Sequence, residues 1–194
     1  MYSAEAILLP LQKLQQRHDE LAHRDILSFD LYKRLKHMVL HFYKYAGKVE
    51  AARAAGDIVL LRHTLLDVFI ICMASANAVN VSIGAAVVAE AESDDLDALA
   101  HALANRVGAT DPYAEALRNL VVIGGKMAKS IESADHMEEG NPRADMAALV
   151  PELAVTTLAV LGHLAGGLES DLQSRLAAVE QRSVLLRATT SRAG

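Results

Sequence analysis

One carboxylate stands inside the most apolar stretch of the chain, and it is the first residue that could do chemistry. Asp67 interrupts the run LLDVFIICMA at residues 65–74. A carboxylate in an apolar helix is unfavourable unless it is paired, neutralised or bound to a metal. His63 lies one turn earlier, so a buried Asp–His or Asp–Arg pair is one interpretation. A ligand site is the other, because perturbed carboxylates cluster at functional sites.

Further acidic residues could join Asp67 in a cation site. Glu50 interrupts an apolar stripe, and it either faces Asp67 across a predicted turn or lies at the stripe edge and reaches solvent. The second half offers a group at i, i+3, i+4 and i+7, namely Glu132, Asp135, His136 and Glu139. On a continuing helix these side chains would share one face and suit Mg²⁺ or Mn²⁺. A solvated helix end gives the same pattern.

The remaining candidates are less specific. Glu152 opens an apolar segment, and an acid in the first turn of a helix needs no other role. Lys48 and Lys126 occupy matching positions in two similar segments and are candidate phosphate-binding residues, although lysines on helices are usually solvated. Residues 20–23 form one Glu-x-x-His motif, but a di-iron bundle needs a second and the sequence has none. Walker loops, nucleophile elbows and Cys/His zinc spacings are also absent from the sequence.

Helices are expected to position these groups. Apolar residues make up 52% of the 194 residues and aromatic residues only 4%, which favours helices packed through aliphatic side chains. An apolar stripe with 3-4 spacing predicts a helix over residues 29–55, with these residues inward: Leu35, Met38, Phe42, Tyr45, Val49 and Ala52. Gly56 should end this helix and Asp57 should cap the next. That next helix, residues 58–79, is apolar almost all round and therefore central.

The rest of the chain predicts further helices with recognisable ends. A first helix or two should span residues 3–24 with Leu11, Leu14 and Leu21 inward, and Ser28 should cap the following helix. The other expected features are a short helix at 83–92, a capped helix ending at Gly108, a helix from Asp111-Pro112, a helix at 144–165 with a kink or restart at Pro151, a final helix at 168–187 and a disordered tail at 189–194.

An internal repeat organises these helices. AGKVEAA at 46–52 matches GGKMAKS at 124–130, and the apolar segment at 60–83 matches the one at 148–171. Residues 1–110 would form the first repeat with a leading helix and a connector, and residues 111–188 a degenerate second repeat. We therefore predict an all-α helical bundle in which two repeats pack with pseudo-two-fold symmetry.

The repeated two-helix unit resembles the MazG-like, all-α nucleoside triphosphate pyrophosphohydrolase superfamily. The similar segments are AGKVEAARAAGD and LRHTLLDVFIICMASANAVNVSI, and the resemblance covers about residues 30–90 and 115–185. Asp67 with its apolar continuation matches the Asp of the family's ExxD motif, and the segment SANAVNV at 75–81 matches the family's LAN-x-L-x-I ending. The resemblance implies a carboxylate cluster that binds Mg²⁺, and water attack between the α and β phosphates of a nucleotide.

The chain departs from the family at the metal-binding positions. The glutamates of the first motif would fall near Tyr45 and Lys48, and Thr64 stands at the Glu of ExxD. In the second half Glu152 fits that Glu, but Val155 stands at the Asp. Neither half holds a complete cluster, and the loss of carboxylates should remove the metal ion.

We therefore expect a MazG-fold protein with an incomplete metal site that binds a nucleotide or acts in regulation, and the sequence leaves open whether it is an enzyme. The first alternative is an active Mg²⁺- or Mn²⁺-dependent NTP or dNTP pyrophosphohydrolase with a rearranged site. Glu50 and Asp67 would then be catalytic, or the acids of residues 132–139 would serve with Glu152. The second alternative is a structural helical interaction protein.

Composition limits the partners and the compartment. The net charge of −5 does not suggest a duplex nucleic-acid binder. Cys72 is the single cysteine, so no intrachain disulfide forms, and its apolar neighbours predict a buried thiol. The longest uninterrupted apolar run, residues 68–74, is far below the roughly 20 residues that span a bilayer. We expect a cytoplasmic protein without a membrane partner, and the family resemblance implies a homo-oligomer.

Overall fold

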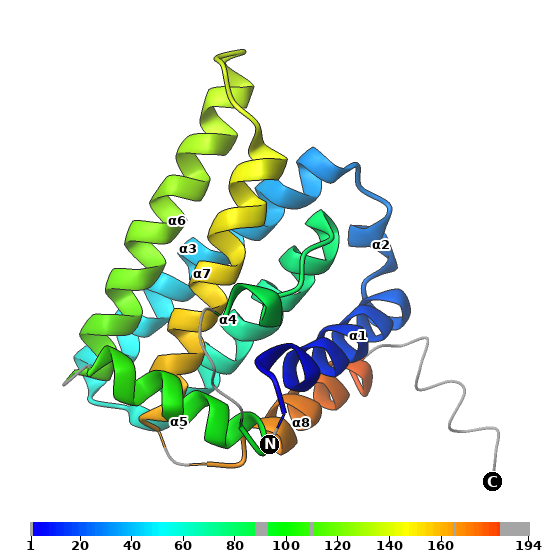
Figure 1. Ribbon diagram of the computed structural model, residues 1–194. Helices are drawn as coiled ribbons and strands as arrows, with labels where there is room; N and C mark the ends of the chain where they lie inside the picture. Colours follow the sequence, from blue (N-terminus) through cyan, green and yellow to red (C-terminus); the bar gives the residue numbers. More distant parts are fainter. Residues whose placement is uncertain (1, 88–92, 109–110, 165, 183–194) are drawn as a thin grey trace, which may run out of the picture.

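Four long helices form the centre of the fold in the computed structural model (Figure 1). Each packs mainly on two of the others, so that they form a ring in the order α3, α4, α7, α6, and α3 and α7 make a smaller contact across it. Their bounds are α3 Leu31–Ala55, α4 Ile58–Val79, α6 Pro112–Asp135 and α7 Pro142–Gly162. The structure describes residues 2–87, 93–108, 111–164 and 166–182, and within these ranges the architecture is all-α, as predicted.

Shorter helices cover the two sides of this ring. They are α1 Ala4–Ala22, α2 Arg24–Leu27, the 3-10 helix η1 Gly84–Ala86, α5 Leu96–Val107 and α8 Leu168–Glu180. α1 and α8 contact each other and both pack on α4, whereas α5 packs mainly on α7 (Figure 1). Helix α4 is therefore enclosed by α1, α3, α7 and α8.

Local capping explains most helix ends. Gly56 adopts a left-handed conformation with φ 63°, and the Asp57 side chain accepts a hydrogen bond of 2.9 Å from the Leu60 backbone N–H, so the predicted turn between α3 and α4 is confirmed. Asn80, also left-handed, ends α4 at the predicted residue. The predicted ends at Gly108 and Asp111-Pro112 are confirmed as well.

Other predicted boundaries were wrong. Asp30 caps α3, because its backbone is extended and its side chain accepts from the Lys33 N–H at 2.9 Å. Ser28 instead has a helical conformation and donates its hydroxyl to Asp25 O at 2.6 Å, so it cannot serve as that cap. Helix α7 begins at Pro142 after the cap Asn141 and continues through the buried Pro151 without a restart.

Three predicted segments are shorter or lie partly outside the described residues. The helix expected at 83–92 is only the 3-10 turn η1 as far as Val87, and residues 88–92 lie outside the described part. Helix α8 ends at Glu180, not at residue 187. The remainder of that prediction from 183 onward, including the predicted tail, lies outside the described part of the chain.

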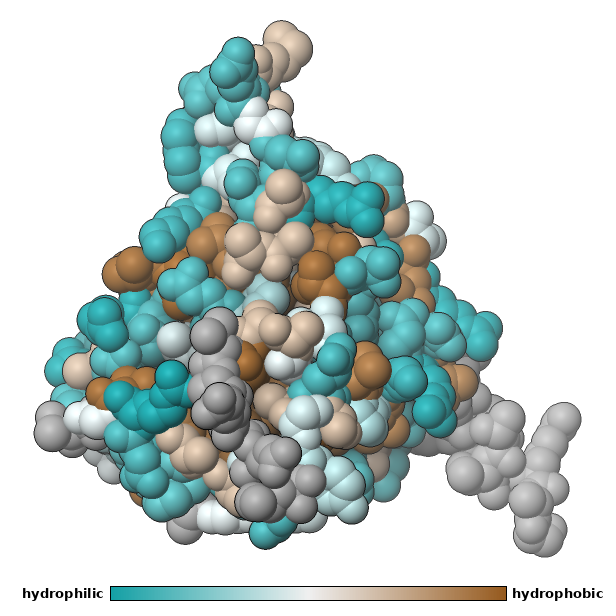
Figure 2. Space-filling model, in the orientation of Figure 1, coloured by the Kyte–Doolittle hydropathy of each residue, from teal (hydrophilic) through white to brown (hydrophobic). Residues whose placement is uncertain are grey.

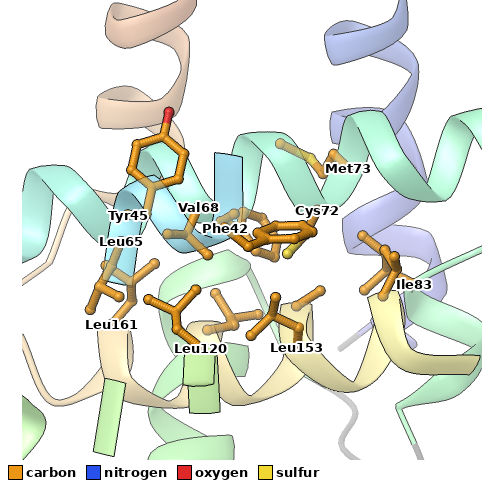
Figure 3. Close-up of a cluster of buried hydrophobic side chains, with 14 of the residues drawn as sticks. Phe42, Tyr45, Leu65, Val68, Cys72, Met73, Ile83, Leu120, Leu153 and Leu161 are labelled. Atoms are coloured by element: carbon orange, nitrogen blue, oxygen red, sulfur yellow. The ribbon is translucent and has the colours of Figure 1, made fainter. Parts of the chain in front are cut away.

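The predicted inward stripe of α3 is buried along its whole length. Phe42 lies against α4, and the close-up of the core shows it together with Val68 and Cys72 above Leu120 and Leu153 (Figure 3). Cys72 is fully buried, and burial raises the pKa of its thiol, which keeps it protonated. The prediction of a buried core thiol is confirmed.

Within the described residues, two helices are long and apolar enough to cross a bilayer by length and composition alone. They are α4 and α7, and in each the most apolar window is 56% buried inside the bundle. Core helices of globular proteins satisfy the same criterion, so this finding is weak support for a membrane protein.

Gly162 marks a close approach between α7 and α5. A Cβ atom at Gly162 would collide with the backbone carbonyl of Ala100, which cannot rotate away as a side chain could.

We predict that Gly162→Ala lowers the free energy of unfolding by about 1–3 kcal/mol. Gly47, in the middle of α3, has no neighbouring atom within 4 Å of such a Cβ. Gly47→Ala should therefore be neutral or stabilising by up to about 1 kcal/mol. Urea denaturation of both variants checks this difference, and equal effects would contradict it.

Candidate functional site

A cavity of about 360 Å³ lies between α1, α3, α4 and α8. Ile70, Ile71, Leu176 and Val179 form apolar parts of its wall. Its polar lining comes from these four helices and from the residues just after α1 and α8: Gln15, His18, Asp19, His23, His41, Tyr45, Lys48, Asp67, Arg175 and Arg182. The cavity therefore gathers residues from both ends of the sequence around Asp67.

Asp67 is paired with an arginine of α8. The Arg175 Nε donates to Asp67 Oδ1 at 2.6 Å, and the two side chains are 32% and 21% exposed. His63, which was predicted as a possible partner, is exposed. The prediction of an Asp–Arg pair is confirmed. The Asp67 carboxylate thus has a cation beside it that would repel a second cation.

A second ion pair joins the same two helices. The Arg62 Nη2 donates to Asp171 Oδ2 at 2.6 Å and to the Gly166 carbonyl at 2.8 Å. Because Asp171 and Arg175 are one turn apart on α8, the two pairs fix the rotation of α8 against α4. This docking holds the Arg175 guanidinium at the cavity wall.

An amide network holds α1 on the other side of the cavity. The Asn77 Nδ2 of α4 donates to the Gln12 carbonyl and to Gln15 Oε1, each at 2.9 Å. The Gln12 Nε2 donates in return to Asn77 Oδ1 and to the Val81 carbonyl, and its Oε1 accepts from the Ile83 N–H at 2.9 Å. The network sets the position of Gln15 and hence of His18, which follows it on the same face of α1.

Tyr45 and His41 of α3 present neutral polar groups to the cavity. The Tyr45 hydroxyl points away from the aliphatic core cluster (Figure 3). Burial, followed by the charge of Asp67, raises the pKa of Tyr45 to about 12, so its hydroxyl stays protonated. Burial and then the positive charge of Lys44 lower the pKa of His41 to about 4. Lys44 Nζ lies 3.1 Å from His41 Nδ1, so a neutral His41 can accept this hydrogen bond.

The prediction that Glu50 faces Asp67 was wrong. Glu50 accepts two hydrogen bonds from Arg53, at 2.6 and 2.7 Å, and both side chains are about half exposed. Arg53 lies three residues along α3, so the ion pair forms on the helix surface. In the described part of the chain Glu50 does not line the Asp67 cavity, whereas Lys48 does.

The expected single face from Glu132 to Glu139 does not form, because α6 ends at Asp135 and Met137 has a φ of 55°. Asp135 turns toward α3, where it accepts from Tyr32 and Lys36, each at 2.7 Å. Glu132 pairs with Lys129, and Glu139 is exposed in the loop. This end of the α6–α7 hairpin projects from the bundle, and its surface is mostly hydrophilic (Figure 2).

Glu152 belongs to a different cavity. It lies with Val155 and Thr156 in a space of about 510 Å³ between α5, α7 and η1, whose wall is largely apolar. Lys126 is exposed on α6 and, among the described residues, lines neither this cavity nor the one at Asp67.

The residues predicted to bind Mg²⁺ or Mn²⁺ therefore do not fit such an ion. Asp67 is paired with Arg175, Glu50 with Arg53 and Glu132 with Lys129, and Glu152 lines a separate cavity. A hard divalent cation needs several oxygen ligands around one point. These acids lie in separate environments, each with its own neighbours, so no step of a metal-dependent hydrolysis can be derived from them.

No family model, curated protein or solved structure gives a significant match to this chain. What the cavity can bind follows from its own side chains. Three cations, two carboxylates, three histidines and a protonated tyrosine line it together with apolar residues. Such a lining suits a small anionic ligand that has both charged and apolar parts.

Sequence reasoning missed the histidines of this cavity. His18 and Gln15 continue an inward stripe of α1 that begins with Leu8 and Leu11, and all four are buried. The predicted inward residue Leu21 is instead 49% exposed. The sequence did contain a signal, because Gln15 and His18 continue at 3-4 spacing the stripe that Leu8 and Leu11 begin. Helical periodicity could not place His23, because it follows the end of α1 with a non-helical backbone.

The low pKa of His41 predicts a loss of stability in acid. In the unfolded chain His41 should protonate near pH 6.5, but in the folded protein only near pH 4, so the unfolded state binds more protons between these values. The contribution of His41 is therefore lost as the pH falls from about 6.5 toward 4. His41→Gln should lose less stability between pH 7 and pH 5 than the wild type, measured from urea midpoints. An equal acid loss in the two proteins would contradict the assignment.

The Asp67–Arg175 pair should be energetically coupled. We predict a coupling of about 1–2 kcal/mol between Asp67→Asn and Arg175→Gln in a double-mutant cycle, since both side chains are mostly shielded from water. Glu50→Gln and Arg53→Gln provide the matched control, and this exposed pair should show no measurable coupling. Urea denaturation of the wild type, the four single variants and the two double variants supplies the free energies. The absence of coupling between Asp67 and Arg175 would contradict the assigned pair.

Proposed function

We propose that the Asp67 cavity binds a phosphorylated small molecule, a nucleotide on the basis of the MazG-like resemblance, and that the protein is a binding or regulatory module. One observation carries the proposal. Tyr45, Lys48 and Asp67 occupy three of the positions at which the resemblance expects metal-binding acids, and all three line one cavity. The cavity therefore lies where the resemblance expects the substrate site, but a tyrosine and a lysine stand there in place of two acids.

The charges of the cavity favour phosphate over a metal ion at this point. Lys48, Arg175 and Arg182 contribute cations, whereas Asp19 and Asp67 contribute carboxylates. Arg175 uses its Nε on Asp67, and the rest of its guanidinium carries further N–H donors. Arginine donors match phosphate oxygens in geometry and charge. A nucleotide phosphate would therefore meet a net positive wall among the described residues.

The remaining wall suits the less polar part of a nucleotide. Ile70, Ile71, Leu176 and Val179 form apolar surface beside the charged residues. The volume of about 360 Å³ falls in the usual range for small-molecule sites. The protonated Tyr45 hydroxyl and the neutral His41 add hydrogen-bonding groups without charge.

Hydrolysis is less well supported than binding. A Mg²⁺-dependent pyrophosphohydrolase needs a cluster of free carboxylates to hold the ion and to activate water. Asp67 is paired with Arg175, and Lys48 adds repulsion at a position where the family resemblance expects an acid.

We further propose that the two halves are related as degenerate repeats. The α3–α4 hairpin and the α6–α7 hairpin each pack against a helix from earlier in the chain, α1 and α5 respectively. Glu152 and Val155 correspond in the repeat to Thr64 and Asp67, and Val155 lines a cavity as Asp67 does. These parallels support a pseudo-two-fold arrangement of two MazG-like units.

Ligand binding tests the proposed function. The protein is titrated calorimetrically with nucleoside triphosphates, monophosphates and pyrophosphate, and at least one should bind. Lys48→Gln should weaken that affinity by about tenfold or more, because a charge-assisted hydrogen bond to phosphate is lost. Lys126→Gln is the matched control, since Lys126 holds the corresponding repeat position outside the cavity, and it should bind like the wild type.

Two kinds of result would contradict this function. The first is a failed binding test, in which neither pyrophosphate nor any nucleotide binds or the two lysine variants have equal effects. The second is pyrophosphate release from a nucleotide with Mg²⁺ or Mn²⁺ that Asp67→Ala abolishes, which would favour the hydrolase alternative. Self-association and a cytoplasmic location stay predictions, and light scattering of the purified protein checks the first.

A further inference from the structure

Three metal-ligating side chains meet at the end of α1. His18, Asp19 and His23 each offer one ligand atom within 4.8 Å of the other two. His18 is only 4% exposed, and Asp19 and His23 are half-buried. All three line the wall of the Asp67 cavity. None of them belongs to the acids that the sequence suggested for Mg²⁺.

The end of α1 creates this grouping. His18 and His23 are five residues apart, which would separate them by about 140° on a continuous helix. Helix α1 stops at Ala22, and His23 adopts φ −131° and ψ 41°. This change of direction brings the rings of His18 and His23 to a centroid distance of 5.4 Å, edge to face.

The carboxylate of Glu180 in α8 contacts the His18 ring. The His18 Nδ1 lies 2.8 Å from Glu180 Oε1. If Nδ1 carries the proton of a neutral imidazole, it donates to Glu180 and leaves Nε2 free as a ligand. Metal-binding histidines usually have such a second hydrogen bond to a carboxylate, which fixes the ring and its tautomer.

Gln15 supplies a further polar group beside the cluster. It is 1% exposed, its Oε1 is held by Asn77, and its Nε2 is buried without a well-formed hydrogen bond among the described residues. It nevertheless lies close enough to Asp19 to favour the carboxylate form. Burial is the larger influence and raises the pKa of the half-buried Asp19, whereas the nearby His23, His18 and Arg34 lower it.

We propose that His18, Asp19 and His23 form a binding site for a divalent first-row transition metal ion, with zinc as the first candidate. Two imidazoles and one carboxylate suit zinc and its neighbours in the series, whereas Mg²⁺ prefers oxygen ligands alone. Three protein ligands leave at least one coordination position for water or for an anion in the cavity. Glu180 is a positioning residue that acts through His18. Metal binding at this site does not rest on the proposed nucleotide binding.

A second group of possible metal ligands within the described ranges can be compared with the His18 cluster. Glu132, His136 and Glu138 also lie within reach of one another, but all three are exposed. Lys129 forms ion pairs with both glutamates, at 2.6 and 3.1 Å, and its ammonium group occupies the place of a cation. His136 therefore serves as the control histidine.

Metal titration of the metal-stripped protein tests the site. One Zn²⁺ per chain should bind by calorimetry in the absence of any nucleotide, and Mg²⁺ should not compete. Co²⁺ should give visible absorption bands that report nitrogen ligation. His23→Gln and Asp19→Asn should each lower the Zn²⁺ affinity by about 100-fold or more, and Glu180→Gln by about tenfold. His136→Gln should keep the wild-type affinity.

The variants are chosen so that folding does not obscure the result. His18 is buried, and its substitution could unfold the protein, so the test relies on the half-buried His23 and Asp19. Circular dichroism before titration verifies that each variant is helical. The proposal is overturned if the wild type binds no stoichiometric Zn²⁺, if His23→Gln and Asp19→Asn bind like the wild type, or if His136→Gln alone abolishes binding. Nucleotide binding could fail in the separate titration without affecting any of these outcomes.

Discussion

The need to cover α4 on every side shapes the rest of the molecule. This helix is apolar almost all round, and side chains such as Leu61, Leu66 and Phe69 are each at most 1% exposed. Burial of one large aliphatic or aromatic side chain contributes roughly 1.5–3 kcal/mol, so exposure of any face would be costly. Helices α3 and α7 cover α4 within the central ring, and α1 and α8 cover it from outside. The two outer helices come from distant parts of the sequence, and the cavity lies where they meet over α4.

Asp67 is the exception in this helix, and its pairing determines the chemistry of the cavity. A buried carboxylate needs a partner, and here Arg175 of α8 supplies it. The contact that docks α8 on α4 also neutralises the Asp67 carboxylate. Because Lys48 and Arg182 also line the cavity, the cations outnumber the carboxylates among its described residues. Helix docking and the neutralisation of Asp67 thus have a common physical cause.

The opposite wall depends on hydrogen bonds between amides. Gln12, Gln15 and Asn77 satisfy one another between α1 and α4, and this fixes the rotation of α1 so that His18 faces inward. Helix α1 then ends, and the change of backbone direction brings His23 back toward His18. Arg175 and the histidines are therefore positioned by different sets of contacts, and the hydrogen bond between His18 of α1 and Glu180 of α8 links the two outer helices.

The sequence by itself determined the features that depend on neighbouring residues. The turn at Gly56 and Asp57, the bounds of α4 and the inward stripe of α3 follow from capping and from the 3.6-residue period, which act over a few residues. The tertiary structure decided which side chains meet. The sequence required a partner for Asp67, but only the packing of α8 selected an arginine 108 residues away, whereas Glu50 found its cation three residues along its own helix. Non-local contacts depend on how whole helices rotate against one another, and no short-range pattern encodes that rotation.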